Sequence, residues 1–412
     1  RWVLLASLGG MLAGARQAEH QALVAAWEPG PGPAPLMGGG AVVGVEPAAW
    51  LNAAALVGLE LDEGNKYAKG HPAAHGLPAV LALASAGRVS GEQLLTALLT
   101  AYEVAARFGR ASSLRPGTHP HGNWGVAGAS AGCARLLGLD PERTAAAIDT
   151  GAGLPIAGHF ASALDGNPVR HAWMGAANVS GLVAARMAAA GVARNTGTAA
   201  GSLGQLLGEF TPEELSVGLG ERWDIELGYF KRHAACSFTH PAADAVLTLR
   251  NQLPDLDGVE DILVETHSLA AGLTRTQWDT QLAALFSTPF VVATALLHGA
   301  VPPQASEESG RRDPAVAALA RRVRVEVAAD LDARLPRERP ARVTVRVDGR
   351  ELTAEVPNPV GDADHEPLDE SQVLSLLESV LDAAAVTTIH EVVSALPTPS
   401  DVAPHLARLA EL

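Results

Sequence analysis

The pattern of the sequence changes at about Gly228, and this change constrains the fold more than any other feature of the chain. Before it, Gly- and Ala-rich segments of helical length, such as 173–190, are separated by Gly/Pro turns. After it, residues 322–327 and 342–347 alternate strictly between polar and apolar, which is typical of strands with one buried face. An Asp-Gly dipeptide after the second of these predicts a tight turn into another strand over 351–356, and hence a hairpin.

This division predicts two domains, and the length of 412 residues agrees with it, because a single hydrophobic core stops growing at about 250–300 residues. We expect residues 1–228 to form a large all-helical domain, with the helical segment 366–412 returning to it. Residues 229–365 are predicted to form a smaller α+β domain with an antiparallel sheet, because its helices and strands do not alternate regularly. The predicted fold class is therefore mostly α with an α+β part.

The composition excludes several classes of protein. Hydrophobic residues make up 48% and charged residues 18% of the chain, which argues against disorder. The net charge is −15 without a basic cluster, so nucleic acid is not an expected partner. Only Cys133 and Cys236 are present, which excludes a disulfide scaffold and fits a reducing, cytoplasmic compartment. No uninterrupted run of about 18 apolar residues occurs, so no membrane span is expected.

The first residues have some features of a signal peptide, because an apolar run follows Arg1 and small residues stand at 13–15. We expect instead an ordinary amphipathic helix whose upstream residues are missing, since the sequence does not begin with Met. This segment is therefore assigned to the helical domain.

Residues suited to acid–base chemistry gather in histidine-containing segments, three of which place a proline directly after His71, His119 or His240. Proline disfavours helical backbone at the preceding residue, so each of these histidines is expected at a helix start or a turn. No spacing typical of a zinc site is present, and we predict no metal. Residues 128–132 match a hydrolase nucleophile elbow, but no strand precedes them, and we interpret them as small residues at a helix crossing.

These segments resemble, in the same order, the motifs of the MmgE/PrpD family. Residues 59–63 resemble its acidic motif, His71-Pro72 its first histidine motif and 117–120 its second. Residues 231–241, with Lys231, Cys236 and Phe238-Thr239-His240-Pro241, resemble its Lys…Cys-x-Phe-Thr-His-Pro motif, and 288–299 resembles a later helix. The resemblance extends over most of the chain.

The resemblance implies a helical domain, a smaller lid domain, a site between them, a homodimer and no cofactor. It also implies that the partner is a small di- or tricarboxylate, and we expect a lyase similar to 2-methylcitrate dehydratase. The alternatives are an epimerase or isomerase, a decarboxylase, and a catalytically inactive protein that binds carboxylates.

Site residues follow from the resemblance position by position. The implied catalytic residues are Asp62, His71, His119 and Lys231. The implied substrate-binding residues are Glu60, Arg170, Cys236 and His240. Some members carry Asp, Lys and His where Glu60, Arg170 and Cys236 stand here, and Tyr near Phe290, which makes the decarboxylase alternative less favoured.

The activities of this family all create or protonate a carbanion next to a carboxylate. Fixed cations stabilise the charge that develops, and Lys231 and Arg170 suit this role. A histidine is suited to move the proton at neutral pH, while Asp62 or Glu60 could orient it or assist a departing hydroxyl. We expect His71 and Lys231 to face one cleft at the domain junction.

Overall fold

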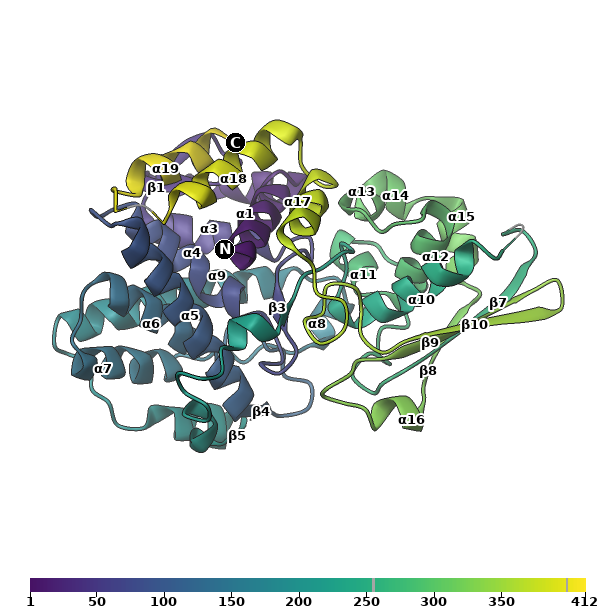
Figure 1. Cartoon of the computed structure of the whole chain (residues 1–412), viewed down its shortest axis with the longest axis horizontal. Helices are drawn as coiled ribbons and strands as arrows, with labels where there is room; N and C mark the ends of the chain where they lie inside the picture. Colours follow the sequence, from purple (N-terminus) through teal and green to yellow (C-terminus); the bar gives the residue numbers. More distant parts are fainter. Residues whose placement is uncertain (254–255, 398) are drawn as a thin grey trace.

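The computed structural model describes residues 1–253, 256–397 and 399–412. A large body of helices lies beside a smaller part that contains the main sheet (Figure 1). The predicted fold class, mostly α with an α+β part, is confirmed. Within the described residues, no helix is both long and apolar enough to cross a membrane.

The helical body is built mainly from helices of the first half of the chain. They are α1 (Trp2–Ala15), α2 (Ala18–Trp27), α3 (Val45–Leu56), α4 (Pro72–Ala84), α5 (Gly91–Ala111), α6 (Val126–Leu136), α7 (Pro141–Ala152), α8 (Ala161–Leu164) and α9 (Val169–Ala189). A π-helical turn η1 (Ala200–Leu206) and the 3₁₀ turns η2 (Pro212–Leu215) and η3 (Asp224–Leu227) follow. A capping box begins α5: the Ser90 hydroxyl accepts the Gln93 N–H, and the Gln93 side chain accepts the Ser90 N–H.

Small residues allow these helices to pack closely. A Cβ added to Gly128 of α6 would lie 2.4 Å from the carbonyl oxygen of Ala101 in α5, and one added to Gly181 of α9 would lie 2.2 Å from the Cβ of Ala129. The Gly/Ala segment 128–132 is therefore a helix crossing, as predicted, and not a strand-to-helix elbow.

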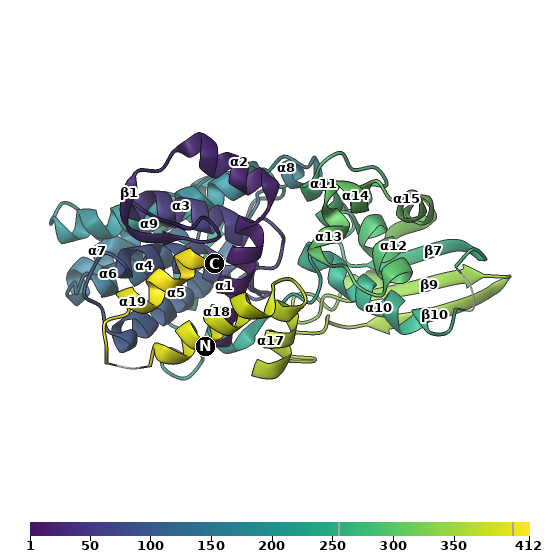
Figure 2. The same cartoon turned by 90° about the horizontal axis from the view of Figure 1, so that it is seen from above.

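The C-terminal helices pack onto the helical body, the first two of them against α1. They are α17 (Glu370–Glu378), α18 (Ala383–Ala395) and α19 (Ala403–Ala407), followed by the 3₁₀ turn η5 (Arg408–Glu411). Two views show α17 and α18 beside α1 (Figures 1 and 2), and a Cβ on Gly9 would lie 2.2 Å from a methyl carbon of Leu377. One hydrophobic core contains residues from both ends of the chain, and another contains residues from the segment between them. We therefore propose domain boundaries at 228/229 and 365/366.

The smaller part contains a four-stranded sheet in the order β10-β9-β7-β8. The strands are β7 (Val259–Thr266), β8 (Val323–Val327), β9 (Ala341–Val347) and β10 (Arg350–Val356). The predicted β9–β10 hairpin is confirmed by the pairing of Val347 with Arg350. The expectation of a purely antiparallel sheet is wrong, because β8 runs parallel to β7. The intervening 56 residues, 267–322, supply the crossover that a parallel pair needs.

Helices accompany this sheet in the smaller part of the chain. They are the 3₁₀ turn η4 (Ser237–Thr239), α10 (His240–Arg250), α11 (Gln281–Leu285), α12 (Thr288–His298), α13 (Pro303–Ser306), α14 (Glu308–Arg311), α15 (Pro314–Ala320) and α16 (Ala329–Asp332). One face of β9 is buried in a core with α10 and α12 and carries Val343, Val345 and Val347. The other face is more exposed and carries Arg342, Thr344 and Arg346, of which the two arginines form ion pairs.

The first 228 residues are not all-helical, which corrects the prediction. Short antiparallel pairs join β1 (Pro31–Leu36) to β2 (Ala41–Val43), β4 (Ser112–Leu114) to β5 (Gly208–Phe210), and β3 (Gly64–Asn65) to β6 (Gly228–Tyr229). The strands β2 to β6 have only two or three residues, and β1, whose sequence is Pro-Gly-Pro-Ala-Pro-Leu, has no alternating pattern. The β3–β6 pair holds the acidic segment after α3 against the segment that leads to Lys231, and thereby positions the site.

Candidate active site

A pocket of about 460 Å³ is lined by residues of both parts of the chain. Of the residues predicted from the sequence, its lining includes Glu60, His71, His119, Arg170 and Cys236. Asp62 and Lys231 lie behind its wall, and His240 lies apart from it. The expectation that His71 and Lys231 face one cleft is therefore wrong for Lys231, whose side chain is fully buried.

A chain of buried ion pairs forms the base of this pocket. Arg170 Nη2 lies 2.5 Å from Glu60 Oε1, and Lys231 Nζ lies 3.1 Å from Glu60 Oε2 and 2.9 Å from Asp62 Oδ1. Glu60 has a positive φ of 54°, which is an unfavourable conformation for a glutamate. This conformation occurs in the turn from which the carboxylates of Glu60 and Asp62 approach Lys231. Because these two cations are matched by two carboxylates, neither is free to bind a substrate carboxylate by itself.

The same ion pairs determine the charge states of Asp62 and Lys231. Burial raises the pKa of Asp62, but the charges of His71, Lys231 and Arg170 together outweigh burial and lower this pKa below its usual range. Burial lowers the pKa of Lys231, and the carboxylates of Asp62 and Glu60 reverse this effect and raise it. Asp62 is therefore an anion and Lys231 a cation over the whole range in which an enzyme operates.

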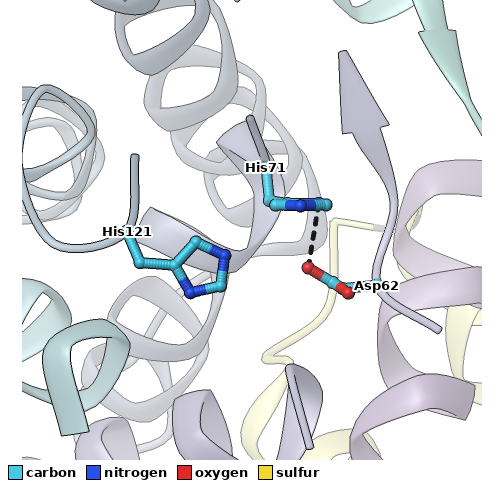
Figure 3. Close-up of side chains that lie close together, drawn as sticks. All are labelled: Asp62, His71 and His121. Carbon is cyan, nitrogen blue, oxygen red and sulfur yellow. Dashed lines mark ion pairs between the residues drawn. The ribbon is translucent and has the colours of Figure 1, made fainter. Parts of the chain in front are cut away.

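Asp62 orients His71. The second carboxylate oxygen, Oδ2, lies 2.9 Å from His71 Nδ1 (Figure 3). The carbonyl oxygen of Glu63 lies 2.7 Å from the same nitrogen. The hydrogen bond to the Glu63 carbonyl oxygen assigns a proton to Nδ1 and leaves Nε2 as the nitrogen that can accept a proton. His71 precedes the first residue of α4 with a non-helical backbone, as its proline neighbour predicted.

Two further imidazoles, those of His119 and His121, line the pocket beside His71. Burial, and secondarily the charge of Arg170, lowers the pKa of both well below the ordinary value, so both rings are neutral. The Arg170 guanidinium donates to His121 Nε2 over 3.2 Å, which places the His121 proton on Nδ1, a buried atom without a hydrogen-bond partner among the described residues. His119 Nδ1 accepts the backbone N–H of His121 over 3.1 Å, so its own proton resides on Nε2. The pair thus supplies two neutral N–H donors.

His75 is a structural partner of this cluster. Its Nδ1 donates to the carbonyl oxygen of His71 over 2.9 Å, and its Nε2 accepts the backbone N–H of Gly122 over 3.1 Å. Burial lowers its pKa to about 4, so the ring remains neutral and the two hydrogen bonds persist at neutral pH. His75 therefore fixes the His71 backbone relative to the loop that carries His119 and His121.

The cations that lack a carboxylate partner lie at other positions on the pocket wall. Lys69, Arg115 and Arg339 line the pocket, and none has an ion pair with a described residue. The Arg339 guanidinium donates to the Lys66 carbonyl oxygen over 3.1 Å and lies 5.3 Å from the ring centroid of Phe238. Arg339 is not among the residues predicted from the sequence, because it lies far from the histidine segments. The only signal near it is an Arg/Pro-rich run, 334–340.

His240 does not contribute to the pocket. Its Nε2 lies 3.1 Å from the carbonyl oxygen of Ala235, and its ring packs 5.1 Å from that of His233, which pairs with Asp244. His240 lies at the start of α10, as predicted, but its backbone is not excluded from helical geometry: its φ of −62° and ψ of −44° are helical. The turn η4 continues directly into α10, and Pro241 occupies the first turn of that helix.

Asp62, His71 and His121 could offer three metal ligands, since one ligand atom of each lies within 4.8 Å of the others (Figure 3). The donor chemistry fits a metal poorly. His71 Nδ1 lies 2.9 Å from Asp62 Oδ2, but this nitrogen carries a proton, which it donates to the Glu63 carbonyl oxygen. Lys231 and Arg170 also place positive charge next to the cluster, which opposes a divalent cation. The absence of a functional metal remains a prediction.

Comparison with known proteins identifies the family. The model of the MmgE/PrpD N-terminal domain matches residues 1–214, and that of the C-terminal domain matches 233–396. The chain therefore belongs to the MmgE/PrpD family, whose members are enzymes that act on small carboxylates and include dehydratases and decarboxylases. It is 30% identical over 243 residues to the cis-aconitate decarboxylase-like protein oryM of Aspergillus oryzae. That match covers 53% of this chain and 49% of the relative, so the chain spans about half the relative's length.

Proposed function

We propose that this protein is a cofactor-independent lyase that acts on a small di- or tricarboxylate, in the manner of a 2-methylcitrate dehydratase. The observation that carries the proposal is the Asp62–His71 pair, because it presents an oriented basic nitrogen to a pocket that also contains neutral N–H donors. This combination is suited to removing a proton from carbon next to a carboxylate.

The proposed reaction is an elimination of water. His71 Nε2 accepts the proton from the carbon next to a substrate carboxylate, and the electron pair of the broken C–H bond moves towards that carboxylate. The unpartnered His121 Nδ1–H donates to the carboxylate oxygen where negative charge develops. The electron pair then forms the C=C bond while the C–O bond to the neighbouring hydroxyl breaks. His119 Nε2–H donates a proton to the departing hydroxyl, so the products are an alkene and water.

Substrate carboxylates are proposed to bind Arg339 and Lys69. Both cations line the pocket without an ion pair among the described residues, whereas Arg170 and Lys231 already face Glu60 and Asp62. A guanidinium can bind a carboxylate through two parallel hydrogen bonds. We therefore assign Lys231 and Arg170 a supporting role, in which they keep the carboxylates that surround His71 charged and fixed.

Decarboxylation is the second candidate function, and the name of the Aspergillus relative favours it. In that reaction a C–C bond breaks, carbon dioxide leaves, and a protonated His71 returns a proton to the carbanion. The same donors would stabilise the intermediate, so the geometry supports both reactions. An epimerase, a binding protein without activity, a homodimer and a cytoplasmic location remain predictions from the sequence.

The proposal is tested by incubating the protein with 2-methylcitrate, cis-aconitate and a chiral dicarboxylate in deuterated water and following each by proton NMR. Dehydration yields an alkene signal from 2-methylcitrate, and decarboxylation yields a methylene product from cis-aconitate. Hydrogen exchange without elimination would identify an epimerase instead. If none of the acids reacts or exchanges, the enzymatic proposal is wrong.

A further inference from the structure

The wall of the active-site pocket is largely apolar, although its base is charged. Apolar side chains enter it from the helical body, as at Leu114 and Phe160, and from the smaller part, as at Phe238, Phe286 and Leu335. An apolar wall offers a carboxylate no hydrogen bond, so burying a charged group against it is costly. This wall is therefore suited to an apolar part of the substrate rather than to its carboxylates.

The apolar wall begins directly beside the acid–base groups. Phe160 stacks on His119 with a centroid distance of 5.3 Å, and Phe286 packs edge-on against Phe160 at 6.0 Å. Cys236 lines the same pocket, and burial raises the pKa of its thiol to about 12, so it is uncharged and behaves as a small apolar group. A substituent on the reacting part of the substrate would meet these side chains first.

Apolar side chains also stand at the rim of the pocket. Leu269 is 52% exposed although it is a large apolar residue, and it belongs to the smaller part of the chain. Leu114 lies at the end of β4, whose pairing with β5 fixes its position on the helical body. The pocket thus presents apolar groups both in its depth, where Phe286 is 3% exposed, and at its rim.

The pocket is large enough for a ligand with both a polar and an apolar part. Its volume of about 460 Å³ falls in the range of about 300–1,000 Å³ that accommodates drug-sized ligands. We infer that the natural substrate is a di- or tricarboxylate that carries an alkyl substituent of several carbons, which lies along Phe160, Phe286 and the rim leucines. This inference rests on the proposed function and names its substrate class.

The experiment compares citrates with a methyl, propyl or hexyl group at the 2-position. Dissociation constants come from calorimetry with His71→Gln, which prevents turnover, and kcat/KM comes from the wild-type protein. Each methylene that leaves water is expected to tighten binding by about fourfold. Equal dissociation constants for the methyl and hexyl compounds would overturn the inference.

Two variants localise the effect on the protein. Leu114→Asn and Leu269→Asn are each expected to weaken binding of the hexyl compound by about three- to tenfold and to leave binding of the methyl compound unchanged. The control is Leu219→Asn, because Leu219 is 70% exposed and does not line the pocket. Equal losses for both compounds in the rim variants would contradict a specific alkyl site.

The results separate this inference from the proposed function. If the methyl compound is dehydrated and chain length has no effect, the proposed function stands and the alkyl site does not. If binding tightens with chain length and no product forms, the alkyl site stands and the proposed reaction is wrong. If no citrate of any length binds, both are wrong.

Discussion

Replacing Asp62 with Asn tests the buried charge network at the point where it meets His71. Asp62 Oδ1 accepts from Lys231 Nζ over 2.9 Å, and its Oδ2 lies 2.9 Å from His71 Nδ1. Asn has nearly the same shape but offers one oxygen where Asp62 presents one to each of these two nitrogens. The variant therefore removes a negative charge and one of the two contacts without opening a large cavity.

The structure sets the expected magnitudes of this change. Breaking a buried ion pair costs about 3–5 kcal/mol when the remaining charge has no other partner. Lys231 keeps Glu60 at 3.1 Å, so we expect Asp62→Asn to lower the free energy of unfolding by about 2–3 kcal/mol. Losing the carboxylate that fixes a histidine tautomer can cost roughly 10,000-fold in kcat. Here the Glu63 carbonyl oxygen still accepts from His71 Nδ1 at 2.7 Å, so we expect a loss of about 100-fold.

The assay is steady-state turnover at pH 7 together with urea unfolding, with Glu63→Gln as the matched control. Glu63 is equally buried, but its side chain contacts Tyr102 and the Ala73 N–H rather than His71. Burial raises the pKa of Glu63 to about 8, so Gln replaces a group that is mostly neutral at this pH, and turnover should stay close to wild type. Wild-type kcat in Asp62→Asn, or equal losses in both variants, would refute the reasoning.

Three further predictions concern the substrate anchor, the pH dependence and the metal. Arg339→Gln should raise KM by at least about tenfold and change kcat much less, because a charge-assisted contact worth about 1.5–3 kcal/mol is lost; equal kinetics in the variant and the wild type would exclude this anchor. Burial raises the pKa of Glu63 from 4.5 to about 8. Its contribution to stability is therefore complete below about pH 4.5 and is lost as the pH rises towards 8. Glu63→Gln should flatten this part of the profile of unfolding free energy against pH, and an unaltered profile would count against a protonated Glu63. Dialysis against a chelator should leave turnover intact, and recovery of lost activity by a single divalent ion would show that a metal is required.

Local sequence patterns predicted much of the fold because they act over short distances. The helix break before Pro72 and the Asp-Gly hairpin each depend on neighbours within a few residues. The family resemblance, which the family models confirm, brought Glu60, His71 and other distant positions together in one prediction. Periodicity alone contains no such information.

Contacts between distant segments account for what the sequence did not predict. The parallel pairing of β7 with β8 depends on how the long connection crosses the sheet, and the short β3–β6 pair depends on tertiary packing. The burial of Lys231 follows from that pair, since it brings the lysine against Glu60 and Asp62 instead of into the pocket. Arg339 could not be predicted, because the sequence does not distinguish a loop arginine that lines a pocket from one that is exposed to solvent.

The proton transfer assigned to His71 is tested most directly by measuring hydrogen exchange at the carbon next to the carboxylate. 2-Methylcitrate in deuterated water is followed by NMR with the wild-type protein and with His71→Gln, and binding is measured in parallel. If His71 is the base, the variant should bind the acid with a similar dissociation constant and exchange the carbon-bound hydrogen at least about 100-fold more slowly. Exchange at the wild-type rate in His71→Gln would show that another group moves the proton and would contradict the central assignment.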